Sequence, residues 1–252
     1  MFCGTYTALV TPFKNDEIDE EAFARLIETQ VTAGTGSNST RDAIAHTREA
    51  EDVGVDGALL VAPYYNKPSQ EGLFRHFTAI AERTSLELVL YNIPGRCGVD
   101  IAADTVVNLA QSCPNIVAIK EASGSVDRVS ELVGRVPDGF AVLSGDDSLT
   151  LPFLAVGAVG VVSVASNLFP VEVAQMVRLF LEGKAREARQ LHRKFFALFK
   201  DIFIEPNPVP AKTILAWRGM MSAECRLPLV GMSKANAARL RKTLAELEDA
   251  GR

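Results

Sequence analysis

Short apolar runs alternate along the chain with stretches in which apolar residues recur every three or four positions. The runs predict strands and the spaced stretches predict amphipathic helices. Most of the runs are continuously apolar, which is typical of a parallel sheet with both faces covered by helices. Strands are expected over residues 5–13, 57–63, 87–92, 116–121, 140–144 and 160–164. Helices are expected over residues 19–33, 70–83, 103–111, 126–136, 149–156 and 171–182.

The strand pattern ends well before the chain does. From residue 185 onward only helical spacing is found, interrupted by a proline-rich stretch at 205–210. We therefore expect a strand-containing domain over 1–184 and a helical region over 185–252. No G-x-G-x-x-G follows the first strand, which argues against a dinucleotide fold. The interpretation is an α/β protein of the TIM-type (β/α) barrel kind, with six strands in place of eight.

An uncharged stretch over residues 151–171 is long enough to cross a bilayer. Prolines, glycines, serines and an asparagine interrupt it, so we interpret it as a short helix, a strand and a loop of the core. No membrane association is expected.

Composition excludes several classes of function. A net charge of -5 with scattered lysines and arginines leaves no basic surface for nucleic acid. The four cysteines form no C-x-x-C pair and no signal peptide precedes them, which indicates reduced thiols and a cytoplasmic location. Three widely spaced histidines without an H-E-x-x-H motif give no support for a metal site.

One lysine is the strongest candidate for chemistry. Lys120 lies near the end of the strand expected over 116–121, at the edge where barrel enzymes carry functional residues. Burial disfavours an ammonium and so increases the share of free amine, which can condense with a ketone or aldehyde. Tyr91 and Arg96 follow the neighbouring strand in a similar position. Together they suggest a class I aldolase, while a buried salt-bridge role for Lys120 stays open.

Seven stretches of the chain, spread over nearly its whole length, resemble the dihydrodipicolinate synthase and N-acetylneuraminate lyase family. They agree best with its synthase branch. The stretches are GTYTALVTPF (4–13), GSNST (36–40), PYYNKPSQEG (63–72), YNIPGR (91–96), IKEA (119–122), SGDD (144–147) and EPNP (205–208).

The resemblance implies the condensation of pyruvate with L-aspartate 4-semialdehyde to 4-hydroxy-tetrahydrodipicolinate in lysine biosynthesis, with no cofactor. Lys120 would form the Schiff base with pyruvate, and Tyr91 would transfer protons. Arg96 would clasp the carboxylate of the semialdehyde at the entrance. The backbone carbonyl of Val162 would line the pyruvate pocket.

The resemblance also implies an assembly. Tyr65 matches a relay tyrosine that reaches into the neighbouring subunit, so a homodimer, or a homotetramer of two dimers, is expected. Simple interface packing is the alternative for the Tyr64 and Tyr65 pair. Asn38, Asp42 and Tyr64 match remnants of the family's lysine effector site.

The chain departs from the family at one place. After the first helix the family continues with a strand ending in Gly-Thr-Thr-Gly-Glu, a helix, and a strand ending in Ala-Gly-Thr-Gly, whereas here Ala33-Gly34-Thr35 directly precedes Gly36. Roughly 40 residues, one strand-helix-strand unit, are missing. The loss would remove a relay threonine, the groups that bind the pyruvate carboxylate and much of the effector site. Either the polypeptide lacks this unit, which we favour, or the sequence joins two parts of a longer chain.

Two other functions stay open. A pyruvate-dependent aldolase acting on a sugar acid would share Lys120, although Arg96 counts against it. A catalytically impaired paralogue, serving as a subunit partner, is suggested by the missing unit and would form no adduct with pyruvate.

Overall fold

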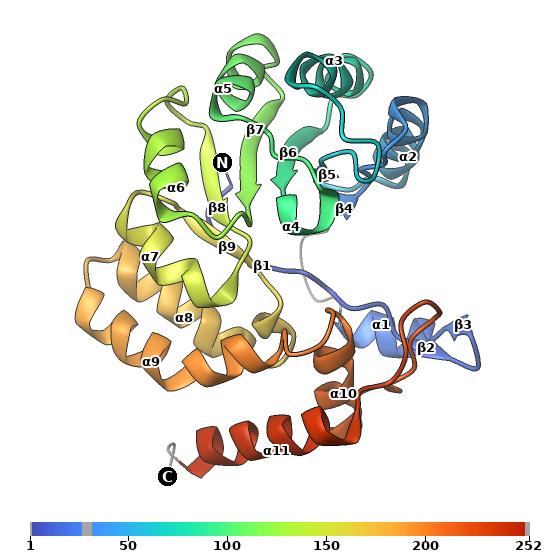
Figure 1. Ribbon diagram of the computed structural model, residues 1–252, viewed down its shortest axis with the longest axis vertical. Helices are drawn as coiled ribbons and strands as arrows, with labels where there is room; N and C mark the ends of the chain where they lie inside the picture. Colours follow the sequence, from blue (N-terminus) through green and yellow to red (C-terminus); the bar gives the residue numbers. More distant parts are fainter. Residues whose placement is uncertain (1, 27–31, 250–252) are drawn as a thin grey trace. The chain divides into compact units, whose positions relative to one another are not determined.

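The computed structural model describes residues 2–26 and 32–249 (Figure 1). The chain divides into two compact units. Unit 1 consists of Met1–Cys3 and Thr29–Val161, and unit 2 of Gly4–Glu28 and Val162–Arg252. This division differs from the expected boundary near residue 184, because the first strand and helix group with the C-terminal region. The functional division into 1–184 and 185–252 stays a prediction.

A seven-stranded sheet forms the centre of the α/β fold. Its order is β1-β9-β8-β7-β6-β5-β4, and the strands from β4 to β9 pair in parallel. The strands are β1 (Gly4–Thr7), β4 (Thr32–Gly34), β5 (Gly57–Val61), β6 (Glu87–Asn92), β7 (Ile116–Glu121), β8 (Ala141–Ser144) and β9 (Gly160–Ser163).

The expected count of six strands was one short. The additional strand, β4, lies where the end of the first helix was expected, and it pairs residue for residue with Gly57, Ala58 and Leu59 of β5. This pairing outweighs the helical spacing of the sequence, because strand formation depends on partners distant in the chain. The expected helix over 19–33 is present as α1 (Glu20–Leu26). Its continuation over 27–31 lies outside the described residues.

The first expected strand, 5–13, was too long. β1 ends at Thr7, and Phe13 belongs to a separate hairpin made of β2 (Phe13–Lys14) and β3 (Glu17–Ile18). Pro12 explains the break, since proline cannot donate to a strand ladder.

Helices cover the outer side of the unit 1 strands, as Figure 1 shows for α2, α3, α5 and α6. The expected helices of this unit are present with small changes at their ends. They are α3 (Gln70–Ala81), α5 (Ala103–Ser112), α6 (Val126–Val133) and α7 (Thr150–Ala155), to which the structure adds α2 (Thr40–Val53) and the short α4 (Pro94–Cys97).

α2 was missed because its buried positions are small or polar, such as Ala43, Thr47 and Ala50. Its termini carried the signal. The side chain of Ser39 caps the N-terminus by accepting a hydrogen bond from the Asp42 N–H, and Gly54 ends the helix in the left-handed conformation, with φ 87°.

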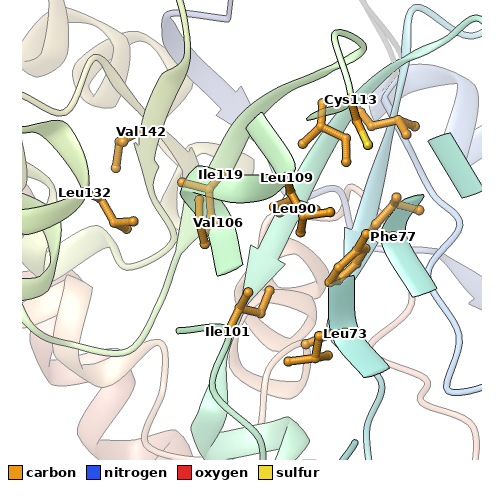
Figure 2. Packing of buried hydrophobic residues seen from close by; sticks show 14 of the residues in the cluster. Leu73, Phe77, Leu90, Ile101, Val106, Leu109, Cys113, Ile119, Leu132 and Val142 are labelled. Atoms are coloured by element: carbon orange, nitrogen blue, oxygen red, sulfur yellow. The ribbon is translucent and has the colours of Figure 1, made fainter. Parts of the chain in front are cut away.

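The core of unit 1 lies between these helices and the strands. Figure 2 shows Leu90 of β6 and Ile119 of β7 packed with Val106 and Leu109 of α5, and Phe77 of α3 lies in the same cluster. Leu90, Ile119 and Phe77 are fully buried. Since strand side chains alternate between faces, the residues next to Leu90 and Ile119 in sequence face the other side of the sheet.

The C-terminal region is helical, as expected. Unit 2 contains α8 (Pro170–Leu181), α9 (Ala185–Asp201), α10 (Val209–Trp217) and α11 (Lys234–Asp249). The proline-rich stretch separates α9 from α10. The 151–171 stretch is divided among α7, β9, the 3-10 turn Ala165–Asn167 and the start of α8. No helix in the described ranges is long and apolar enough to cross a membrane.

Candidate active site

Lys120 and Tyr91 lie side by side on neighbouring strands of unit 1. They are register partners of β7 and β6, and both face the side of the sheet opposite the Leu90 and Ile119 cluster. The Lys120 Nζ atom is 4.0 Å from the centroid of the Tyr91 ring. Only 5% of Lys120 is exposed. The two candidates from separate sequence motifs therefore form one contact.

Burial makes the Lys120 amine reactive near neutral pH. Loss of solvent lowers its pKa from 10.5 to about 8; the negative charge of Asp147 opposes this shift and the positive charge of Arg96 adds to it. At pH 7 about one molecule in ten would then carry the free amine, compared with roughly one in several thousand for an unshifted lysine. The amine can therefore act as a nucleophile without a separate base.

Tyr91 is suited to donate a proton. Burial raises the pKa of its phenol to about 12; Arg96 lowers it, whereas Cys97 and Asp146 raise it. The phenol therefore stays protonated at neutral pH and can serve as a hydrogen-bond donor or general acid beside the amine.

Gly145 provides the space that the Lys120 side chain occupies. A Cβ atom at this position would lie 2.8 Å from the Cβ of Ala122 and 3.2 Å from the Cε of Lys120. The turn after β8, which continues with Asp146 and Asp147, thus needs a residue without a side chain where it passes the lysine.

Arg96 lies in α4, the short helix that follows β6 directly. Pro94 begins the helix, and Gly98 ends it with a left-handed φ of 72°. Arg96 is exposed, so its guanidinium can meet a ligand from solvent. Its charge affects both Lys120 and Tyr91, which places all three in one electrostatic environment.

Tyr65 presents its ring to solvent from a constrained backbone. It is 88% exposed, its φ is 74°, and its N–H donates to the Cys97 carbonyl oxygen at 3.3 Å. A non-glycine residue rarely adopts a positive φ, and such conformations concentrate at functional sites. The loop of Tyr64 and Tyr65 is therefore tied to the helix that carries Arg96.

The remaining candidates come from other elements than Lys120 and Tyr91. Asn38 is joined to the tyrosine loop, since its carbonyl oxygen accepts a hydrogen bond from Asn66 Nδ2 at 2.9 Å. Asp42 lies in the first turn of α2. Val162, half-buried on β9, belongs to unit 2, and its place beside Lys120 stays a prediction. Within the described ranges, no group of three or more His, Cys, Asp or Glu side chains could hold a metal ion.

Comparison with known proteins assigns the family. The model of the dihydrodipicolinate synthetase family matches residues 29–247. The chain belongs to this family. It is 44% identical to the 4-hydroxy-tetrahydrodipicolinate synthase of Sulfurihydrogenibium sp. over 97% of this chain and 98% of that protein.

Solved structures of the family support the same assignment. The 4-hydroxy-tetrahydrodipicolinate synthase of Methylacidiphilum fumariolicum SolV matches with a TM-score of 0.97 and 52% identity, over 99% of this chain and 97% of that one. A second structure, described as the first monomeric dihydrodipicolinate synthase variant, matches with a TM-score of 0.95 and 35% identity, over 98% of this chain and 97% of that one.

The family match also shows a length difference. The match with the Sulfurihydrogenibium protein extends over 286 residues, whereas this chain has 252, so at least 34 positions (286 minus 252) have no counterpart here. The described sheet nevertheless keeps seven strands. The expected loss of two strands was therefore too large by one, because the strand that ends in Ala33-Gly34 is retained as β4.

Asp147 and Gly145 were recognised from the sequence only as members of the SGDD stretch (144–147). Their effects on Lys120 depend on the parallel register that places β8 beside β7, with Leu143 opposite Lys120. The available signal in the sequence was a glycine and two carboxylates directly after an apolar run. This run is the next one along the chain after the run that carries Lys120.

The pKa of Lys120 can be tested without a substrate. We expect half-maximal modification of its amine by acetic anhydride at about pH 8, measured by mass spectrometry of the Lys120 peptide. Asp147→Asn should lower this midpoint, because it removes a charge that stabilises the ammonium, and Arg96→Gln should raise it. A wild-type midpoint near 10.5, or shifts of equal sign in both variants, would contradict this electrostatic description.

Proposed function

We propose that the chain condenses pyruvate with L-aspartate 4-semialdehyde, through a Schiff base on Lys120, to give 4-hydroxy-tetrahydrodipicolinate in lysine biosynthesis. The observation that carries the proposal is the buried Lys120 amine, with its pKa lowered to about 8 and its Nζ atom 4.0 Å from the Tyr91 ring centroid. Relatives named 4-hydroxy-tetrahydrodipicolinate synthase, 44% identical over nearly the whole chain, support the reaction.

The first half of the reaction requires an amine and an acid. The free amine of Lys120 attacks the ketone carbon of pyruvate, which forms a C–N bond and a carbinolamine. Protonation of the hydroxyl group by Tyr91 lets it leave as water and gives the iminium. The Tyr91 phenolate then takes a proton from the pyruvate methyl group, which produces the enamine and restores the phenol.

The second half forms the carbon–carbon bond. The enamine carbon attacks the aldehyde carbon of the semialdehyde, and the developing alkoxide takes a proton from Tyr91. The amino group of the semialdehyde then attacks the imine carbon, closes the ring and releases Lys120. Arg96, exposed on α4, would bind the semialdehyde carboxylate in two parallel hydrogen bonds, and the Val162 carbonyl would line the pyruvate pocket.

We infer further that the fold is a TIM-type (β/α) barrel shortened by one strand and one helix. The seven-stranded order and the unmatched positions support this. The shortened barrel would span 1–184, with 185–252 as the helical region. A relay threonine would be lost with the missing segment, so Tyr65 and Tyr91 would act without it, and the turnover number should fall below that of full-length relatives.

The proposed enzyme is an assembly of identical chains. The exposed Tyr65, with its positive φ, supports a homodimer or homotetramer in which this residue serves the neighbouring site. Asn38, Asp42 and Tyr64 would be remnants of a lysine site.

The cytoplasmic location stays a prediction from the cysteine pattern. A sugar-acid aldolase and a non-catalytic subunit partner are the less favoured alternatives.

Schiff-base formation is tested by incubating the purified chain with pyruvate and borohydride and measuring the intact mass. We expect one stable adduct on Lys120, absent in Lys120→Arg and unchanged in Lys200→Arg, whose exposed lysine lies on α9. Circular dichroism should show that Lys120→Arg is folded. No adduct in a folded wild-type sample would exclude the proposed reaction and favour the non-catalytic alternative.

Substrate selection is tested with Arg96→Lys. Loss of the planar fork should lower kcat/KM for the semialdehyde about 10- to 100-fold, because bonds to charged groups contribute about 1.5–3 kcal/mol each. The rate of pyruvate trapping should change much less. An equal loss in both measurements would contradict a role specific to the second substrate, and turnover of a sugar acid by the wild type would favour the other aldolase.

Assembly is tested by sedimentation velocity. We expect the wild type to sediment as a dimer or larger, and Tyr65→Ala to shift it towards the monomer, since an exposed aromatic anchor is lost. Val53→Ala, at an 81% exposed site on α2, is the matched control. A monomeric wild type at micromolar concentration would contradict the proposed assembly.

A further inference from the structure

A second register pair lies directly beside the Lys120 and Tyr91 pair. Glu121 of β7 is opposite Asn92 of β6, and both side chains are fully buried. Because strand side chains alternate, these two face the helix side of the sheet while Lys120 and Tyr91 face the other side. This is also the last pair of the β6–β7 register.

Both oxygens of the Glu121 carboxylate accept hydrogen bonds, from three different residues. Asn92 Nδ2 lies 3.1 Å from both carboxylate oxygens, Arg128 Nε donates to Oε2 at 2.8 Å, and the Ser123 N–H donates to Oε1 at 2.7 Å. The group therefore joins the end of β6, the loop after β7 and the helix α6 that carries Arg128.

Asn92 and Arg128 extend the network to the segment that follows α4. Asn92 donates to Asp100 Oδ1 at 2.6 Å and accepts a hydrogen bond from the Ile101 N–H at 3.0 Å. Arg128 donates to the Ile101 carbonyl oxygen, and its Nη1 atom lies 3.6 Å from Asp100 Oδ2. The same groups therefore hold Asp100 and Ile101, which follow the helix that carries Arg96.

Stability alone does not account for this arrangement. A buried ion pair gains little over apolar residues of the same size, because both charges lose their hydration. Its hydrogen bonds are directional, however, and they fix the relative position of the groups that they join. Here they fix the last register pair of β6 and β7, one residue from the amine and the phenol.

We propose that Glu121, acting through Asn92 and Arg128, is a positioning residue that keeps the Lys120 amine buried over the Tyr91 ring. Glu121 lies on the opposite face of the sheet from the amine and does not touch the reacting atoms. The reaction that it serves rests on the proposed function, whereas the effect on Lys120 does not. Release of the strand end would expose the Lys120 amine to water. Its share of free amine at neutral pH would then fall towards that of an exposed lysine.

The pH profile of Lys120 distinguishes positioning from a charge effect. Glu121→Gln removes a negative charge, which by electrostatics alone would lower the pKa of a neighbouring ammonium. Loss of burial would raise it. The charged and titratable groups that act on Lys120 from β6, α4 and the turn after β8, namely Tyr91, Arg96 and Asp147, are unchanged in this variant.

The experiment measures acetic anhydride modification of Lys120 and pyruvate trapping as functions of pH. For Glu121→Gln we expect the midpoint to rise from about 8 towards 10 and trapping at pH 7 to slow about 10- to 100-fold, in proportion to the free amine. Glu71→Gln, which breaks the exposed pair of Glu71 with Arg75, is the matched control and should leave both unchanged.

A double variant separates positioning from stability. In Glu121→Gln the largely buried Arg128 loses its closest carboxylate, so the melting temperature should fall. Glu121→Gln with Arg128→Gln removes this charge and should recover the melting temperature without recovering the Lys120 midpoint. Recovery of both, an unchanged midpoint in Glu121→Gln, or a lowered one would overturn the proposal. If the wild type traps no pyruvate but its modification midpoint still responds to Glu121→Gln, the proposed function fails and the positioning role stands.

Discussion

Removal of the Lys120 amine from water is the constraint on which the site depends. A lysine with 5% exposure, on a strand between two other strands, has lost most of its contact with water, which disfavours its charged form. The parallel register then determines what surrounds it: a phenol from β6 and a carboxylate from the turn after β8. The chemistry follows from the order of the strands as much as from the residues themselves.

Much of the fold was predictable from local pattern. β6 and β7 have the bounds that their apolar runs indicated, because a strand buried on both faces leaves an uninterrupted signal. β4 and α2 were not predictable in this way. β4 exists through its pairing with β5, and α2 buries alanine and threonine, so neither produces a hydrophobic period of its own.

The candidate site was predictable to a similar extent. Strand-end position and motif identified Lys120, Tyr91 and Arg96, and the structure brings the first two into contact. Glu121 and Asn92 were not singled out, although each directly follows a candidate in sequence. Their importance depends on which face of the sheet they occupy and on Arg128 from the next helix, neither of which a single sequence states.

The strand order also separates the reactive pair from the end of the sheet. β6 and β7 each retain a strand on both sides, whereas β4, with three residues, is the last strand in the order. A change next to β4 would leave the neighbours of the amine-bearing strand intact. In this architecture β5 separates the reactive pair from the end of the sheet, which insulates the pair from changes there.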